Sequence, residues 1–316
     1  MRGAFFRALL TLAERDHRIN LIVGDLGFGV VEEFARRFPD RFLNAGIAEQ
    51  NMTGIAAGMA LSGKIVFTYS IANFPILRCL EQVRNDVCYH NANVKIVAVG
   101  GGLAYGSLGA THHATEDLAI MRSLPRMVVV APGDPDEAEA ATQALAAHAG
   151  PCYLRLGRAG EANVHSGELD FRLGKAVTVR QGHDLTLIST GGMLETAVQT
   201  AELLHQSGLE TRVLSMHTVK PLDGNTVRAA ARETGAVFTL EEHSVDGGLG
   251  GAVAEVLAES GEGAFTFRRF GLPSAFSSNV GTQEYLRAQH GLTAEAVASA
   301  ITSTLGKNST FAATTG

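Results

Sequence analysis

The segment KIVFTYSIANFPILRCLEQVRNDVCYHNANVKIVAV, residues 64–99, decides the fold. It begins and ends with short apolar runs, KIVFT at 64–68 and VKIVAV at 94–99, which have the composition of buried β-strands. Between them, residues 75–90 carry apolar side chains at helical spacing. Two buried strands joined through a helix are typical of parallel pairing. The segment therefore predicts an α/β protein.

The same alternation continues on both sides of this segment. Helical patterns are predicted at 4–15, 48–61, from Thr115 and at 135–147, and strands at 20–24, 127–131 and 152–156. After Gly157 a polar stretch has the composition of a linker. A second α/β unit follows, with strands at 184–189, 211–215, 236–240 and about 264–270. We therefore predict two consecutive parallel-sheet α/β domains, 1–160 and 179–306, joined by a linker at 161–178 and followed by a disordered tail at 307–316.

Composition and charge indicate a folded protein with a small-molecule partner. Charged residues make up 18% of the chain and its net charge is −6, so nothing favours binding to nucleic acid or to an anionic membrane. The three cysteines, Cys79, Cys88 and Cys152, fit neither a disulfide framework nor a zinc site. Residues 1–16 mix charges into a short apolar run, unlike a signal peptide or a membrane span. We expect a cytoplasmic protein without a metal site of its own.

Two glycine-containing loops, at 100–109 and 246–251, differ from nucleotide-binding fingerprints. The first departs from GxGxxG spacing and lacks an acidic ribose ligand downstream, and the second has no lysine. Both are expected to be tight turns or helix ends.

One motif goes beyond a generic α/β fold. LNAGIAEQNM at 43–52 resembles the glutamate-bearing motif of the pyrimidine-binding domain in transketolases, deoxyxylulose-phosphate synthases and the β subunits of 2-oxoacid dehydrogenases. Residues 110–138 resemble the histidine loop of this family, and 151–158 resemble the end of its domain. Residues 219–223 and 239–251 look like the family's C-terminal domain. The resemblance covers about residues 5–300.

The resemblance also implies a partner. Family members that carry all functions in one chain begin with a diphosphate-binding domain, whose GDG…N motif holds Mg²⁺ against the phosphates of thiamine diphosphate. No GDG occurs in this sequence. We therefore expect the C-terminal subunit of a split, transketolase-like enzyme. A separate N-terminal subunit would hold the diphosphate and Mg²⁺, with two copies of each subunit in an α2β2 heterotetramer.

Cofactor contacts are carried over from the family by position. Glu49 matches the glutamate that bonds to the aminopyrimidine ring and drives loss of the thiazolium proton, because a carboxyl group in a dry site stabilises the imino tautomer. Without the resemblance, Glu49 would be an acidic residue favoured by the N-terminus of a helix. Phe74, four residues before Arg78, matches the stacking aromatic. Tyr69 is expected on the same wall, and we place Arg78 among the cofactor-binding residues.

Substrate contacts follow in the same way. His112 matches the histidine that handles a proton or holds an oxyanion near the reacting carbonyl, and His113 stands beside it where many members have glutamine. Arg158 matches the arginine that anchors substrate phosphate. Arg155, three residues earlier and on the predicted strand, is grouped with it as a substrate contact. For both arginines a salt bridge to a neighbouring domain is the alternative. His217, Glu242 and His243 are expected to be structural.

Two positions depart from the family pattern. Ketose-using transketolases have an aspartate that reads a donor hydroxyl four residues before the substrate histidine, where this chain has Leu108. A second substrate histidine would fall near Gly100. Because a site built to hydrogen-bond a hydroxyl discriminates strongly for it, these losses predict an altered donor or acceptor.

The leading hypothesis is transfer of a two-carbon ketol or acyl unit with thiamine diphosphate, in a specialised sugar or secondary pathway. One alternative is a β subunit of a 2-oxoacid dehydrogenase or a deoxyxylulose-phosphate-synthase-like enzyme. Another is a scaffolding subunit that keeps the fold without catalysis, because fold alone does not imply activity.

Overall fold

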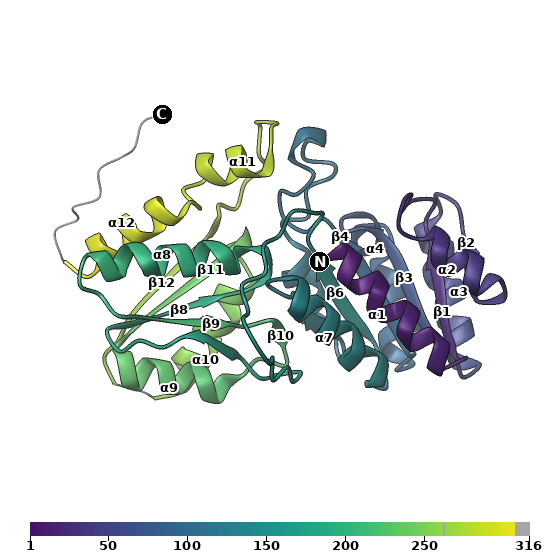
Figure 1. Ribbon diagram of the computed structural model, residues 1–316, viewed down its shortest axis with the longest axis horizontal. Helices are drawn as coiled ribbons and strands as arrows, with labels where there is room; N and C mark the ends of the chain where they lie inside the picture. Colours follow the sequence, from purple (N-terminus) through teal and green to yellow (C-terminus); the bar gives the residue numbers. More distant parts are fainter. Residues whose placement is uncertain (262, 307–316) are drawn as a thin grey trace.

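The computed structural model describes residues 1–261 and 263–306 and contains two α/β units that lie side by side (Figure 1). Each unit has one sheet with helices on both faces, so the predicted α/β class with two units is confirmed. The predicted tail at 307–316 lies outside the described residues. No helix among the described residues is long and apolar enough to cross a membrane.

The first unit is built on a seven-stranded sheet with the order β10-β5-β6-β4-β3-β1-β2. All neighbouring strands are parallel except β10 and β5. The strands are β1 (Ile19–Val23), β2 (Phe42–Asn44), β3 (Ile65–Ile71), β4 (Val94–Val99), β5 (Val128–Val130), β6 (Cys152–Leu156) and β10 (Thr218–Lys220).

Helices cover both faces of this sheet because its strands are apolar on both sides. In β4, Val97 and Val99 pack into one core, while Ile96 and Ala98 pack into the other. The first face carries α1 (Arg2–Arg15), α2 (Glu32–Arg37) with the short η1 (Pro39–Arg41), and α7 (Pro135–Ala147). The second face carries α3 (Glu49–Leu61), α4 (Phe74–Leu77), α5 (Leu80–Gln82), the π-helical segment η2 (Val83–Tyr89) and α6 (Asp117–Ser123).

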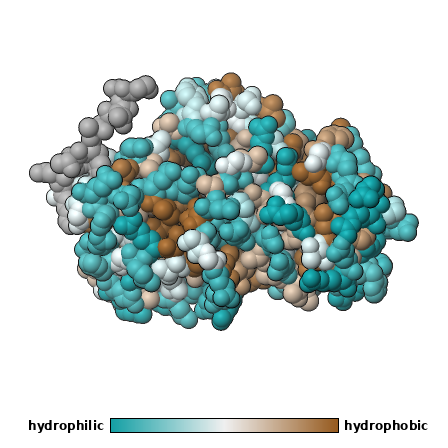
Figure 2. Space-filling model, viewed as in Figure 1, coloured by the Kyte–Doolittle hydropathy of each residue, from teal (hydrophilic) through white to brown (hydrophobic). Residues whose placement is uncertain are grey.

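The second unit has a five-stranded sheet with the order β12-β11-β8-β9-β7, parallel except for the edge strand β7. The strands are β7 (Val177–Arg180), β8 (Leu185–Ser189), β9 (Thr211–Ser215), β11 (Ala236–Ser244) and β12 (Thr266–Leu272). One face carries η4 (Gly191–Met193), α8 (Leu194–Gln206), α11 (Gln283–Gln289) and α12 (Ala294–Thr304). The other carries α9 (Gly224–Thr234) and α10 (Leu249–Glu259). Figure 2, drawn in the same view as Figure 1, shows a largely hydrophilic surface whose main cluster of apolar residues lies over the second sheet.

The sequence did not predict that β10, from the second half of the chain, would complete the first sheet. It pairs antiparallel with β5, and Lys220 Nζ donates to the carbonyl oxygens of Arg122 (2.8 Å) and Leu124 (2.5 Å) at the end of α6. The two units are therefore joined through a shared sheet as well as through packing.

The predicted helix at 75–90 is wrong in detail, because it is divided into α4, α5 and the π-helical η2. Buried Val83, Val87 and Cys88 keep an apolar spacing that a regular helix also shows, so periodicity could not reveal the division. The predicted linker also ends earlier than expected, since β7 begins at Val177.

Candidate active site

The candidate site lies at the carboxyl edge of the first sheet, where β1 and β3 end. Gly24 follows β1, and a Cβ placed on it would lie 3.6 Å from both Glu49 Cγ and Ser70 Oγ. Ligands of parallel α/β sheets bind at this edge. The Glu49 side chain therefore lies in van der Waals contact range of the turn that follows β1, at this edge.

Glu49 is the first residue of α3, and its side chain is only 2% exposed. Its Oε2 accepts a hydrogen bond from Arg78 Nη1 at 3.0 Å. Its Oε1 is buried and has no hydrogen-bond partner among the described residues. Because an unsatisfied buried acceptor costs about 1–3 kcal/mol, such an oxygen marks a position where a ligand donor belongs.

Phe74 and His112 continue the site from Arg78. The guanidinium carbon of Arg78 lies 4.3 Å from the centre of the Phe74 ring, and the His112 ring packs edge-on to Phe74 with centroids 5.2 Å apart. His112 Nδ1 lies 3.0 Å from Thr111 Oγ1. The structure thus brings together Glu49, Arg78, Phe74 and His112, which the sequence predicted from separate segments.

Tyr69 is not part of this group, and its expected place on the wall with Phe74 is wrong. Its side chain belongs to the core beneath α1, where the ring stacks on Phe5 (centroids 6.2 Å apart) and meets Phe6 edge-on. The cause is strand alternation, which turns Tyr69 to the opposite face of the sheet from the neighbouring Ser70. Burial raises the pKa of Tyr69 above its ordinary value.

His113 supports the histidine loop from inside. Its side chain is buried, and Nε2 lies 3.5 Å from the Gly106 carbonyl oxygen. The same carbonyl accepts from Gly281 N (3.4 Å) in the second unit. A small cavity of about 60 Å³ beside this contact is lined by residues of both units, including His113, Asn73 and His290. His113 thus contacts the interface between units, whereas His112 contacts Phe74.

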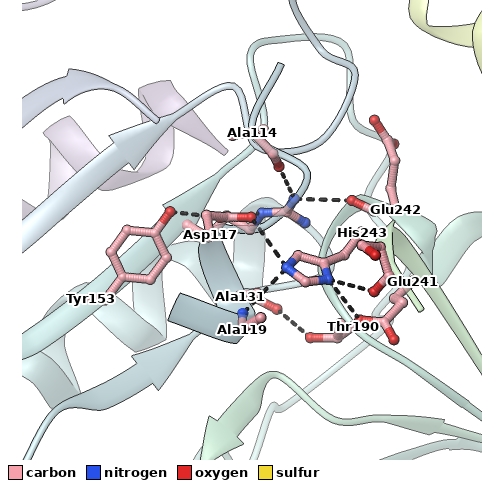
Figure 3. Close-up of polar contacts among 12 residues, drawn as sticks. Ala114, Asp117, Ala119, Ala131, Tyr153, Thr190, Glu241, Glu242 and His243 are labelled. Atoms are coloured by element: carbon pink, nitrogen blue, oxygen red, sulfur yellow. Dashed lines mark hydrogen bonds and ion pairs between the residues drawn. The ribbon is translucent and has the colours of Figure 1, made fainter. Parts of the chain in front are cut away.

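Arg155 does not join the site, and its substrate-binding role is a prediction that the structure does not support. Its Nε donates to Asp117 Oδ2 at 2.8 Å, and its Nη2 donates to the carbonyl oxygens of Ala114 and Glu242 (Figure 3). Burial alone would lower the pKa of Arg155, but the carboxylate of Asp117 and nearby groups raise it. Tyr153 also donates to Asp117 Oδ2, at 2.6 Å. This buried pair lies within the first unit, so the salt bridge to a neighbouring domain that the sequence left open for Arg155 is not formed; Arg155 reaches the second unit through the Glu242 carbonyl oxygen at 3.0 Å.

Residues of the second unit extend this interface. Glu242 accepts from Leu103 N (2.5 Å) and from Gln283 Nε2 (2.9 Å) and pairs with Arg287. Its neighbour His243 accepts at Nε2 from Ala119 N (3.3 Å). These contacts are structural, as the sequence predicted for Glu242 and His243.

His217 is also buried in protein contacts. Its ring stacks on Phe171 with centroids 3.9 Å apart, and Nδ1 lies 2.9 Å from Thr218 Oγ1. The expected structural role of His217 agrees with these contacts.

Arg158 lies beyond the end of β6 and is exposed. Its guanidinium carbon is 5.1 Å from the centre of the Tyr105 ring. Tyr105 was not predicted as a site residue, although an aromatic inside the glycine-rich loop at 100–109 was a usable signal. Its ring covers Gly100, one of the two departures from the family pattern. The other, Leu108, is 52% exposed.

The edge-of-sheet glutamate lies in a mainly parallel α/β unit that is followed by a second α/β unit. Residues 1–160 match the transketolase pyrimidine-binding domain, and residues 174–297 match the transketolase C-terminal domain. The chain therefore belongs to the transketolase family, as its motifs predicted.

Several relatives are similar over nearly their whole length. The chain is 41% identical over 300 residues to one of the subunits of an apulose-4-phosphate transketolase of Phocaeicola vulgatus, covering 94% of each chain. It is 40% identical over 298 residues to a 6-deoxy-6-sulfo-D-fructose transketolase subunit of Clostridium sp., covering 94% of this chain and 92% of the other. A 1-deoxy-D-xylulose-5-phosphate synthase of Desulforudis audaxviator is 37% identical, but the match spans only 46% of that protein.

Among solved structures, "Split gene transketolase, inactive beta4 tetramer" is 40% identical, with a TM-score of 0.89 and coverage of 96% of this chain and 98% of that one. The predicted match to one subunit of a split transketolase is confirmed by these similarities.

Proposed function

We propose that this chain is the pyrimidine-binding subunit of a two-subunit, thiamine-diphosphate-dependent transketolase. A partner subunit would hold the diphosphate and Mg²⁺, in an α2β2 heterotetramer. The observation that carries the proposal is the buried Glu49 Oε1, which has no partner among the described residues. The described part of the chain contains no group of three or more His, Cys, Asp or Glu that could hold a metal ion.

The residues present fit a thiamine pyrimidine ring. Glu49 would bind a ring nitrogen through Oε1, while Arg78 holds Oε2 in place, and Phe74 would offer its face to the ring. When bound, thiamine diphosphate supplies a carbon nucleophile for cleavage beside a ketose or 2-oxoacid carbonyl. The role of Glu49 is to hold one proton at the ring nitrogen and to transfer it. Because the Glu49 side chain is buried, water is excluded from this contact.

Substrate handling is assigned to His112 and Arg158. His112 lies against Phe74, where an imidazole can accept or donate a proton beside a bound carbonyl. Arg158 is exposed and would bind an anionic group of the substrate. Leu108 offers no hydrogen bond to a donor hydroxyl, which supports a non-standard donor or acceptor in a specialised sugar pathway. The names of the two relatives, which mention a sugar phosphate and a sulfosugar, are in keeping with this.

The test is to co-express the chain with a diphosphate-binding subunit encoded beside it and to measure ketol transfer with thiamine diphosphate and Mg²⁺. Glu49→Gln should abolish turnover while leaving the complex intact, because the amide cannot exchange the proton. Glu81→Gln, on the neighbouring α5, is the matched control. Full turnover by Glu49→Gln would support the scaffolding role instead.

The same assay addresses the substrate. Release of a free sugar product without a lipoyl carrier distinguishes transketolase chemistry from that of a 2-oxoacid dehydrogenase. Full activity with xylulose 5-phosphate would remove the idea of a non-standard donor.

A further inference from the structure

A cavity of about 310 Å³ lies between the two units, apart from the candidate active site. The first unit lines it with Leu156 and Gly157 at the end of β6, and the second unit with Gly191 and Gly192, which follow β8, and with Glu242 of β11. Its volume is within the usual range for small-molecule sites. The described residues that line it include none of the candidate site residues Glu49, Phe74, Arg78, His112 and Arg158. The cavity is therefore a candidate for a second ligand site.

The position of this cavity follows from the order of strands in the second sheet, β12-β11-β8-β9-β7. The chain runs from β8 to β9 on one side, and it later returns through α9 to β11 on the other side of β8. The connections therefore reverse direction between β8 and β11. Open parallel α/β sheets bind their ligands beyond the carboxyl ends of the strands at such a reversal. Gly191, just after β8, and Glu242, near the end of β11, both line the cavity, so it occupies this position.

Arg155 supplies an unused donor to the wall of the cavity. Its side chain is 5% exposed, and Nε and Nη2 donate to Asp117 Oδ2 and to the carbonyl oxygens of Ala114 and Glu242. Nη1 has no hydrogen-bond partner among the described residues, and a Cβ on Gly191, which also lines the cavity, would lie 3.7 Å from it. A buried charged donor without an acceptor costs free energy, so Nη1 marks a position for an anionic group of a ligand.

Three carboxylates stand at the exposed side of the same cavity. Glu195, Glu284 and Glu295 lie in the first turns of α8, α11 and α12 and are exposed. One acidic residue in the first turn of a helix is common, because the helix N-terminus favours it. Three of them around one cavity also repel one another, so a cation placed between them is attracted to all three. None of the three forms an ion pair within residues 1–261 and 263–306.

The other two carboxylates of the cavity already have cationic partners. Glu242 pairs with Arg287 and also accepts from Gln283 Nε2 at 2.9 Å. Glu161 accepts from the Met1 amino group at 2.9 Å. The groups left for a ligand are therefore one guanidinium nitrogen at the buried side and three carboxylates at the exposed side. A ligand that matches both sides has an anionic end and a cationic end.

We propose that this cavity binds a small aminocarboxylate, whose carboxylate accepts from Arg155 Nη1 and whose ammonium group lies among the three exposed carboxylates. The site is separate from Glu49, so the inference goes beyond the proposed function and does not depend on it. Because both units line the cavity, a bound ligand contacts both of them and stabilises the packing between them.

The first test measures binding to the full chain without its partner subunit. Each standard amino acid is screened by thermal unfolding, and those that raise the unfolding midpoint are titrated by calorimetry. At least one amino acid should bind saturably. Its decarboxylated amine and its deaminated carboxylic acid should each bind at least about tenfold more weakly, because each analogue keeps only one charged end. Binding of none of the amino acids, or equal affinity for the two analogues, would overturn the proposal.

The second test changes the exposed carboxylates, because replacing Arg155 would also break its ion pair with Asp117. Glu195→Gln combined with Glu295→Gln should weaken binding of the same amino acid about tenfold and leave the unfolding midpoint of the free chain unchanged. Glu259→Gln is the control, since Glu259 is exposed at the end of α10 and does not line the cavity. Unchanged affinity in the double variant would contradict the assigned place of the ammonium group and with it the proposal.

The third test fills the cavity from its wall. A Cβ on Gly192 would lie 3.3 Å from Arg287 Nη2, at the flexible end of that side chain. Gly192→Val should therefore fold, as checked by circular dichroism, and bind the amino acid at least about tenfold more weakly than the wild-type chain. Equal affinity would place the ligand elsewhere and overturn the proposal. These measurements need neither thiamine diphosphate nor turnover, so failure of this inference and failure of the proposed function are distinguishable.

Discussion

Arg78 Nη1 lies 3.0 Å from Glu49 Oε2, although the two side chains differ greatly in exposure, at 49% and 2%. The arginine thus reaches from the surface to hold one oxygen of a buried carboxylate, and its other contact is the Phe74 ring. The proposed cofactor-binding Glu49 and the proposed stacking residue Phe74 are therefore linked through one cation.

This link predicts coupling between Glu49 and Arg78 in stability. Removing either partner leaves the other without its ion pair, so a double-mutant cycle with Glu49→Gln and Arg78→Met should give a coupling energy of about 1 kcal/mol by urea unfolding. Arg84→Met, combined with Glu49→Gln, is the control, since Arg84 is exposed and donates to the neighbouring Asn85 Oδ1 at 2.8 Å. Additive effects of Glu49→Gln and Arg78→Met would contradict the link.

His112 and His113 should respond differently to replacement. His112→Asn should lower kcat by about 10²–10⁴ with little change in the unfolding midpoint, because its ring contacts Phe74 at the site. His113→Asn should mainly lower the unfolding midpoint, because its ring is buried against Gly106. Steady-state kinetics and thermal unfolding on both variants check this. The reverse pattern would show that the two histidines had been assigned the wrong way round.

The sequence predicted the alternation of elements well, because buried strands such as β4 and the amphipathic helices leave clear apolar patterns. It could not predict β10, since three residues carry no periodicity and their pairing with β5 depends on how the two units pack. Motif matching selected Glu49, Phe74, Arg78 and His112 from separate segments, and the structure brings these four side chains together. Tyr69 shows the limit of such matching, because one residue along a strand changes the face to which a side chain points.

Arg155 and Tyr105 show a second limit. Both side chains lie against a glycine in space, and only their three-dimensional contacts distinguish their surroundings. Arg155 pairs with Asp117 and is buried, whereas Tyr105 covers Gly100 at the edge of the first sheet. Arg155 and Arg158 are three residues apart, so strand alternation would put them on opposite faces, and Arg158 lies beyond the end of β6 in any case.

The Asp117–Arg155 pair should be a major contributor to the stability of the first unit, in which both residues lie. Its side chains are 2% and 5% exposed, so removing one partner leaves a buried charge. Arg155→Met should lower the free energy of unfolding by about 3–5 kcal/mol in urea titrations. Arg172→Met, in the exposed pair with Asp170, should cost less than about 0.5 kcal/mol. Equal losses of unfolding free energy in Arg155→Met and Arg172→Met would show that burial of the Asp117–Arg155 pair does not explain its contribution to stability.

His165 should make stability depend on pH. Burial would lower its pKa, but the hydrogen bond and charge of Glu137, 2.8 Å from Nε2, raise it overall. Because the folded pKa exceeds the unfolded value of about 6.5, the stabilisation is complete below that pH and is lost as pH rises through the folded pKa. His165→Asn should therefore lower the unfolding midpoint more at pH 5.5 than at pH 8.5. The control is His183→Asn, at an exposed position, whose effect on the unfolding midpoint should be the same at both pH values. If His165→Asn lowers the midpoint equally at both pH values, the charged pair of His165 and Glu137 is excluded.

Ile47 should be part of the surface that meets the partner subunit. It is 76% exposed and stands two residues before the buried Glu49, and Phe28 is equally exposed. Exposed apolar patches often mark surfaces that another protein covers. Ile47→Asp should therefore abolish co-purification with the diphosphate-binding subunit while leaving the unfolding midpoint of the free chain unchanged. Leu61→Asp is the control, because Leu61 is 60% exposed at the far end of the same helix, α3. If Ile47→Asp forms the complex as well as Leu61→Asp does, the partner binds elsewhere, and Glu49 cannot lie at the contact between subunits.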